Sequence, residues 1–200
     1  MRSLASVVLL ASLSSSALAS EAPSAIWRLG MPAWIVAMSV ANPLEADALT
    51  VGLGGSGDIV STQIMLRWDQ DKKYQMTDSI WFEGYRQAGY TIWQIAGESL
   101  EHETSNHTLD VMQGFRWYFA DKEDWLSYVN VALGVSLISN DELDGKKFGG
   151  PFQFTEFVGI GGYVTPQWQW DLGVRHYSNN DIYEENSGIN FYRLNISYNY

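Results

Sequence analysis

The last nine residues of the chain alternate strictly between apolar and polar side chains. The apolar set is Tyr192, Leu194, Ile196, Tyr198 and Tyr200, and the polar set is Arg193, Asn195, Ser197 and Asn199. Side chains two positions apart in a β-strand share a face, so this pattern predicts a strand with one apolar and one polar face. Such a strand fits a lipid-facing barrel wall, although a strand of a soluble sandwich also alternates.

The same period of two recurs between turn-forming clusters throughout residues 49–200. Candidate strands cover 49–55, 60–69, 79–94, 105–119, 126–139, 151–164, 168–178 and 189–200, and turns are expected at 69–73, 121–124, 140–145 and 165–167. Eight is an even number, as bacterial single-chain barrels require, and an aromatic final residue is typical of their closing strand. We therefore predict an all-β fold, a single eight-stranded antiparallel transmembrane β-barrel of the bacterial outer membrane.

Residues 1–48 have the features of an export signal. A positively charged start and an apolar run precede a small-x-small site, which predicts cleavage after Ala19. Alternatively, translation begins at Met31 and cleavage follows Ala48, and a buried helix over 26–41 is a third interpretation. After residue 48 no stretch reaches the ~18 apolar residues that a membrane-spanning helix needs.

Composition excludes several classes of function. The formal net charge is −11, and phosphate contacts need Lys and Arg, so no nucleic-acid partner is expected. The chain has no cysteine, which removes disulfides, thiol catalysis and thiolate metal sites. His102 and His107 lack the spacing of convergent metal ligands, the glycine-rich segment 53–57 lacks the lysine of a phosphate loop, and 141–145 lacks the ligands of a calcium loop. The sequence predicts neither a metal nor a cofactor.

Charged residues within the strands are expected to face the barrel interior. The candidates are Arg67, Arg86, Arg116, Arg175 and Arg193, with acids such as Asp110 and Asp171. Eight strands enclose a space that side chains fill, so we expect a polar network rather than a channel.

Strand 168–178 carries polar residues on its apolar face. His176 and Ser178 continue the even-numbered set that begins with Trp168. Polar groups facing lipid are costly unless they are paired or functional. If both chain ends are periplasmic, this strand runs outward and places His176 and Ser178 near the outer leaflet, where lipopolysaccharide lies. The alternative is that the strand has left the hydrocarbon by residue 176 and that His176 has no role.

Hairpin register predicts what lies beside His176. A turn around Pro166 gives paired residue numbers that sum to about 332, which places Glu156 opposite His176 on the same face. The following hairpin brings Asn190 near His176 from the other side. A serine, a histidine, a carboxylate and an amide thus converge. Such a group suits ester cleavage, in which histidine activates the serine hydroxyl, an acid orients the histidine and donors hold the oxyanion.

A family resemblance strengthens this hypothesis. The segment 174–179, which reads Val-Arg-His-Tyr-Ser-Asn, together with Asn186-Ser187-Gly188 and the closing strand, resembles PagL-type lipid A 3-O-deacylases. The likeness also includes 50–57, 66–69, 88–93 and 154–161, and so covers nearly all of 49–200. It implies an active site on the outer barrel wall that hydrolyses the 3-O-linked 3-hydroxyacyl ester of lipid A in the outer leaflet, without a cofactor. It further implies Ser178 as nucleophile, His176 as general base and Asn179 as oxyanion donor.

The sequence leaves open which residue is the acid that orients His176. Where the family places a glutamate after the glycine of the last outer loop, this chain has Asn190. Glu156 is favoured as the acid because its register follows from the hairpin alone, whereas Glu184 or Glu185 would have to fold over from the loop. Loss of activity is the remaining interpretation, and it would leave a catalytically degenerate barrel with a structural or adhesive role. A lipid A acyltransferase and a homodimer also stay open.

Overall fold

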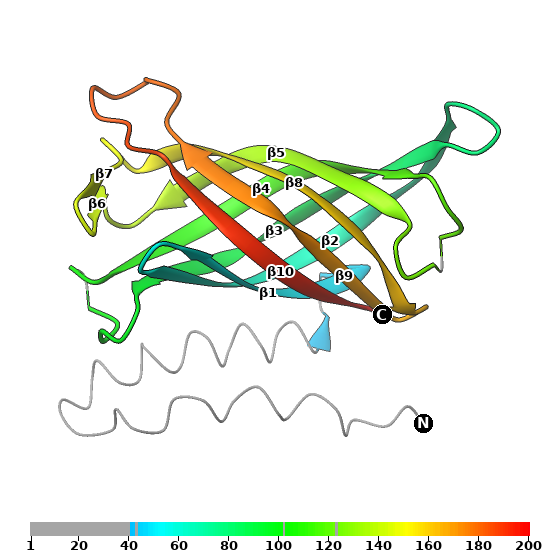
Figure 1. The fold of residues 1–200 in the computed structure, drawn as a ribbon, viewed down its shortest axis with the longest axis horizontal. Helices are drawn as coiled ribbons and strands as arrows, with labels where there is room; N and C mark the ends of the chain where they lie inside the picture. The colour runs from blue at the N-terminus through cyan, green and yellow to red at the C-terminus, as the bar shows by residue number, and fades with distance from the viewer. Residues whose placement is uncertain (1–40, 43, 102, 123) are drawn as a thin grey trace. The chain divides into compact units, whose positions relative to one another are not determined.

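The chain forms a closed antiparallel β-barrel of eight strands, as predicted (Figure 1). The structure is a computed structural model that describes residues 41, 42, 44–101, 103–122 and 124–200. The chain divides into two compact units, Met1–Pro43 and Leu44–Tyr200, and the barrel belongs to the second. The predicted export signal therefore lies almost wholly outside the described residues. No helix among the described residues is long and apolar enough to cross a membrane.

The barrel strands match the predicted segments closely. They are β1 (Ala48–Ser56), β2 (Ile59–Gln75), β3 (Trp81–Ile95), β4 (Ser105–Tyr118), β5 (Tyr128–Ile138), β8 (Phe152–Thr165), β9 (Trp168–Ser178) and β10 (Ile189–Asn199). Neighbours follow the order β1-β10-β9-β8-β5-β4-β3-β2 around the barrel. A short hairpin, β6 (Glu142–Leu143) and β7 (Lys146–Lys147), lies in the connection between β5 and β8.

The turn predicted at 69–73 is wrong, because β2 continues through this segment to Gln75. The pairing of β2 with β3 shifts register between Asp69 and Lys73, which is where a bulge admits the polar residues without ending the strand. Beyond the shift, Tyr74 stacks on Phe82 with ring centroids 4.8 Å apart. Figure 1 shows this hairpin reaching past the other strands at the end that holds the C-terminus.

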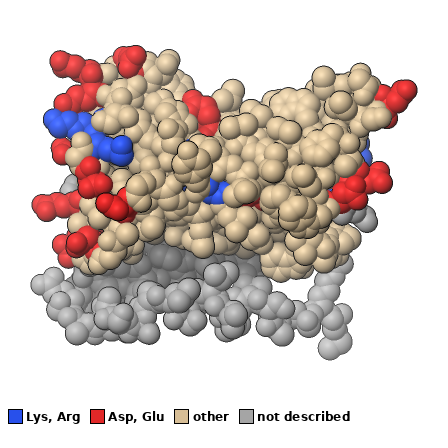
Figure 2. Space-filling view, viewed as in Figure 1, with Lys and Arg blue, Asp and Glu red and all other residues tan. Residues whose placement is uncertain are grey.

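The outer wall is apolar around its middle. Large exposed apolar side chains include Leu53, Leu109, Val111, Leu133, Val158, Ile160, Leu172, Leu194 and Ile196. In the view of Figure 2, Asp, Glu, Lys and Arg side chains gather mainly at the two ends of the barrel. This distribution is that of a wall in contact with hydrocarbon between two aqueous surfaces.

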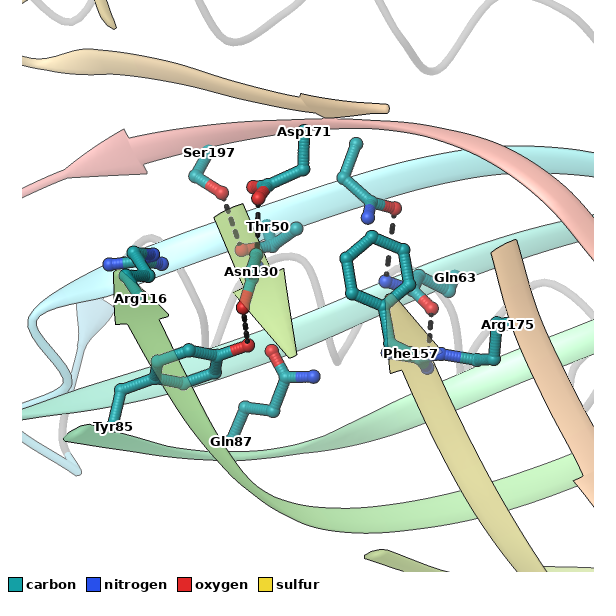
Figure 3. Close-up of a pocket in the computed structure, with 11 residues that line it drawn as sticks. Thr50, Gln63, Tyr85, Gln87, Arg116, Asn130, Phe157, Asp171, Arg175 and Ser197 are labelled. Atoms are coloured by element: carbon teal, nitrogen blue, oxygen red, sulfur yellow. Dashed lines mark hydrogen bonds between the residues drawn. The ribbon is translucent and has the colours of Figure 1, made fainter. Parts of the chain in front are cut away.

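The interior is polar and filled, as expected. Asn130 accepts a hydrogen bond from Tyr85 Oη at 2.7 Å and donates one to Asp171 at 2.8 Å, while Arg175 donates to Gln63 at 2.8 Å (Figure 3). The cavity among these side chains measures only about 10 Å³. Side chains therefore fill the described barrel and leave no open channel along it.

The prediction that Arg86 belongs to the interior network is wrong. Arg67, Arg116, Arg175 and Arg193 are buried inside the barrel, but Arg86 is exposed on the outer wall. Tyr85 and Gln87 on either side of it face inward and are buried. Strand alternation then forces Arg86 outward, because the odd positions of β3 supply its inner face.

Candidate active site on the outer wall

Strands β8, β9 and β10 bring the predicted site residues together. Glu156 pairs with His176 in the β8–β9 ladder, and Asn190 pairs with His176 in the β9–β10 ladder. Ser178 pairs with Phe154 on the same face. The register sum of 332 predicted from the turn around Pro166 is therefore confirmed.

Tyr177 fixes the direction in which its two neighbours point. Its ring is fully buried inside the barrel and packs against Trp93, with centroids 4.8 Å apart, and against Phe191, with centroids 6.1 Å apart. These rings belong to an apolar cluster at this end of the barrel interior. Because alternate side chains in a strand point to opposite faces, anchoring Tyr177 inward turns His176 and Ser178 outward.

Asn190 is the hydrogen-bond partner of His176. The Nδ1 of His176 lies 2.7 Å from Oδ1 of Asn190. An amide oxygen only accepts, so Nδ1 carries the proton in this contact and Nε2 keeps its lone pair. Gly188 lies against the ring with a φ of +58°, and a Cβ there would lie 3.3 Å from Cε1 of His176. The imidazole is thus held in the tautomer that can accept a proton through Nε2.

Glu156 flanks His176 from the other side without binding it. Among the described residues its carboxylate has no hydrogen-bond partner, and its Oε2 is buried. Glu156 also lines an open groove of about 300 Å³ with Ser178, Phe154, Leu133 and Asn180. The ladder places Glu156 opposite His176, but the hydrogen bond to the imidazole comes from Asn190.

The hydrogen-bond donors of Asn179 are all used by the outer loops. Its side chain is fully buried, and its Nδ2 donates to the carbonyl oxygens of Phe148 and Glu185, both at 2.7 Å. Its backbone N–H donates to Oδ1 of Asn186 at 3.1 Å. To donate to an oxyanion, Asn179 would have to give up one of these bonds.

The two acids of the loop do not reach His176. Glu185 pairs with Lys147 at 3.0 Å, and Glu184 is exposed without a partner among the described residues. The Glu185 hydrogen bond raises the pKa of Lys147 above the ordinary lysine value. No hydrogen bond or ion pair of the described residues joins either loop acid to the imidazole, whose partner is Asn190.

A brace between two outer loops was not predicted from the sequence. The backbone of Lys147 in β7 exchanges hydrogen bonds with Ser187, at 2.8 Å through its carbonyl and at 3.0 Å through its N–H. Figure 1 shows the β6–β7 hairpin and the connection from β9 to β10 at the same end of the barrel. No local sequence signal links 147 with 187, since the contact joins two loops far apart in the chain.

His107, the other described histidine, does not belong to this group. His107 lies on β4, where its Nδ1 meets the hydroxyl of Tyr90, and His102 lies outside the described residues. Within the described part of the chain no group of three or more His, Asp or Glu side chains could hold a metal ion.

Comparison with known proteins assigns the family. The family model described as lipid A 3-O-deacylase (PagL) matches residues 58–199. A lipid A deacylase PagL of Pseudomonas aeruginosa is 28% identical over 170 residues, which cover 83% of this chain and 93% of the relative. One of Bordetella bronchiseptica is 26% identical over 120 residues, 60% of this chain and 57% of the relative.

The fold agrees with this assignment. A crystal structure of the outer membrane enzyme PagL superimposes with a TM-score of 0.66 at 24% identity, covering 76% of this chain and 99% of that one. The barrel, its apolar wall and the match of the family model over most of the chain are mutually consistent. This chain is an outer-membrane β-barrel that belongs to the PagL family of lipid A 3-O-deacylases.

Proposed function

We propose that the chain hydrolyses the 3-O-linked 3-hydroxyacyl ester of lipid A on the lipid-facing wall of the barrel. The observation that carries the proposal is the outward pair His176 and Ser178, with Asn190 holding Nδ1 of the histidine at 2.7 Å. Two residues of one strand face are about 7 Å apart along the backbone, so their side chains can approach each other. A lipid confined to the outer leaflet can reach such a site without leaving the membrane.

In the proposed reaction Ser178 is the nucleophile and His176 is the general base. His176 Nε2 takes the hydroxyl proton as Ser178 Oγ attacks the ester carbonyl, and the proton then goes to the departing 3-oxygen of the sugar. Water hydrolyses the resulting acyl-serine and releases a 3-hydroxy fatty acid. Neither a metal nor a cofactor enters these steps.

In this proposal Asn190 and Glu156 each perform one of the two functions that a single acid usually performs. Asn190 orients the imidazole, and the Glu156 charge stabilises the imidazolium from the neighbouring strand. Asn179 is retained as the candidate oxyanion donor, through a rearrangement that frees its amide or its backbone N–H. The groove of about 300 Å³ beside Ser178 gives the acyl chain a place next to Phe154 and Leu133.

Mass spectrometry of lipid A from an outer-membrane host tests the proposal. The native chain, Ser178→Ala and Glu156→Gln are expressed to equal levels in folded form. We expect the native chain to remove one 3-hydroxyacyl mass and Ser178→Ala to remove none. Glu156→Gln should retain a reduced activity, about tenfold lower, since it loses a charge but not the base. Added mass on lipid A would indicate acyl transfer instead.

A catalytically degenerate barrel is the second candidate. It is favoured by Asn190 at the expected acid position and by the unpaired Glu156 carboxylate. It predicts unchanged lipid A in hosts that supply different acyl chains, even where the barrel is folded and inserted. It also predicts no difference between the native chain and Ser178→Ala.

A further inference from the structure

Arg86 is a charged side chain on the lipid-facing wall. The other four arginines of the described strands are at most 2% exposed and lie inside the barrel, whereas Arg86 is exposed. It has neither a hydrogen bond nor an ion pair with any described residue. A cation on this face destabilises a membrane barrel unless it reaches the interface or meets an anion.

Two amides extend Arg86 into a polar patch. Gln113 pairs with Arg86 in the β3–β4 ladder, and Gln70 Nε2 donates to Gln113 Oε1 at 3.2 Å. This bond passes over Gly84, where a Cβ would lie 2.3 Å from Gln70 Oε1. Gln113 Nε2 donates to the carbonyl of Gly114 at 3.1 Å. Each amide nitrogen carries two N–H groups, so one on each glutamine stays available to a ligand.

The patch, composed of Gln70, Arg86 and Gln113, lies between apolar and aromatic surfaces. On one side Arg86 is followed by the outward residues Ala88 and Tyr90 of β3, which pair with Val111 and Leu109 of β4. On the other side Phe82 packs against Phe115 and Trp117, with centroids 6.0 and 5.9 Å apart. Aromatic side chains of this kind mark the headgroup level of a membrane protein, and a long arginine side chain can extend to that level.

With both chain ends on the periplasmic side, the patch and the candidate active site lie in different leaflets, and the strand order places them on opposite walls. Arg86 is near the start of β3, at the end where β1 begins and β10 finishes, whereas Ser178 is the last residue of β9 at the other end. In the barrel order β3 and β9 are four strands apart in either direction. A molecule at the patch therefore cannot touch the substrate ester, and its leaflet is the inner one, which consists of glycerophospholipids.

We propose that Gln70, Arg86 and Gln113 bind the phosphodiester of an inner-leaflet glycerophospholipid. The planar guanidinium offers paired N–H donors that match phosphate oxygens, and the glutamine amides supply further donors. The acyl chains of the lipid lie along the apolar surface of Ala88, Val111 and Leu109. The anion offsets the charge of Arg86, which explains how an arginine persists on this wall.

Lipid retention tests the proposal without measuring activity. The full mature barrel is purified in a phosphate-free non-ionic detergent and titrated with phosphatidylglycerol, phosphatidylethanolamine or diacylglycerol. Native mass spectrometry counts retained lipids, and the thermal midpoint reports stabilisation. We expect one retained molecule of either phospholipid, a saturable rise in midpoint and no effect of diacylglycerol. Arg86→Gln should weaken the apparent affinity about tenfold, the loss of one charge-assisted pair.

Controls separate binding from folding. Arg86→Lys keeps the charge but loses the planar fork and should bind with intermediate affinity. Lys72→Gln removes an exposed cation of the same hairpin and should bind normally. Gln113→Leu provides a second route if Arg86→Gln folds poorly, and it should also weaken retention. Equal retention and equal midpoint shifts in the native barrel, Arg86→Gln and Gln113→Leu would overturn the proposal, as would the same shift with inorganic phosphate alone.

Discussion

At the residue scale, the site differs from a serine hydrolase triad in the group that holds the histidine. Asn190 accepts the Nδ1 proton of His176 and so selects the tautomer. In the proposed reaction, a neutral amide cannot offset the charge that the imidazole would gain on removing the serine proton. Hydrogen bonds to charged groups contribute about 1.5–3 kcal/mol, more than neutral ones, so a carboxylate at this position would lower the barrier.

Asn190→Asp is therefore expected to raise kcat by about tenfold, and Asn190→Ala to lower it by about tenfold. Both variants keep the strand pairing, because Asn190 is exposed and its backbone stays in the β9–β10 ladder. Release of 3-hydroxy fatty acid by the purified barrel in mixed micelles measures the effect. An unchanged rate in Asn190→Asp together with no activity in Glu156→Gln would identify Glu156 as the working acid.

At the scale of elements, two outer loops support the wall that carries Ser178. Asn179 donates two buried hydrogen bonds, one to each loop, and a Cβ at Gly149 would lie 2.2 Å from the carbonyl oxygen of Glu185. The ion pair between Lys147 and Glu185 joins the same loops at the surface, where both side chains are about half exposed. Buried bonds of this kind contribute more to loop order than an exposed ion pair.

Asn179→Ala should destabilise the connection 179–188 by about 2 kcal/mol, since the Glu185 carbonyl loses its donor and the Phe148 carbonyl keeps only the hydrogen bond from Gln153. Amide hydrogen exchange of this segment measures the loss, and we expect kcat to fall with it. Lys147→Gln is the matched control, and we expect it to change the exchange rates little, because an exposed ion pair contributes little to stability. In the native chain the pKa of Lys147 is raised, so the ion pair between Lys147 and Glu185 is complete below the ordinary lysine pKa. The ion pair should weaken only as the pH rises beyond that value. Faster exchange in Lys147→Gln than in Asn179→Ala would contradict this ranking.

At the scale of the whole molecule, the barrel is held by charges in its interior. Asp110 accepts hydrogen bonds from Thr91 and Ser136, each at 2.6 Å, and lies 3.8 Å from Arg175. Arg193, buried nearby, has no hydrogen-bond partner for its three side-chain nitrogens among the described residues. Asp110 is thus the acid that pairs with the buried Arg175.

Asp110→Asn should lower the free energy of unfolding by about 3–5 kcal/mol, because it leaves the buried Arg175 without its counter-charge. Urea unfolding of the barrel in lipid vesicles, followed by heat-modifiable gel mobility, measures the change. Asp78→Asn, at an exposed position of the β2–β3 turn, serves as the control with no expected effect. Equal midpoints for the two variants would show that the interior acid is dispensable.

The start of the mature chain is constrained by the barrel. Asp47 donates its backbone N–H to Arg67 at 2.8 Å, accepts the N–H of Tyr200 at 3.0 Å and accepts the N–H of Asp69 at 2.7 Å through its side chain. Cleavage after Ala48 would remove all three contacts. We therefore expect the mature chain to begin at or before Asp47, and the intact mass of the membrane-inserted form measures this. A mass that begins at Leu49 would contradict it.

The sequence alone determined the barrel and most of the site. Alternation is local, so the eight strands, the outward direction of His176 and Ser178 and the pairing of Glu156 with His176 follow from period and turn position. The continuation of β2 to Gln75 does not follow from them, because the bulge after Asp69 interrupts the alternation and the charged residues there are typical of a turn.

Only the tertiary structure decided which side chains meet. A period of two defines two faces of β3 but not which face points into the barrel, so the predicted inward direction of Arg86 is wrong. Register placed both Glu156 and Asn190 beside His176, and side-chain geometry between strands selected Asn190. The brace from Lys147 to Ser187 joins loops about 40 residues apart in the chain, a contact between the connections of nearby strands and not the product of any local pattern.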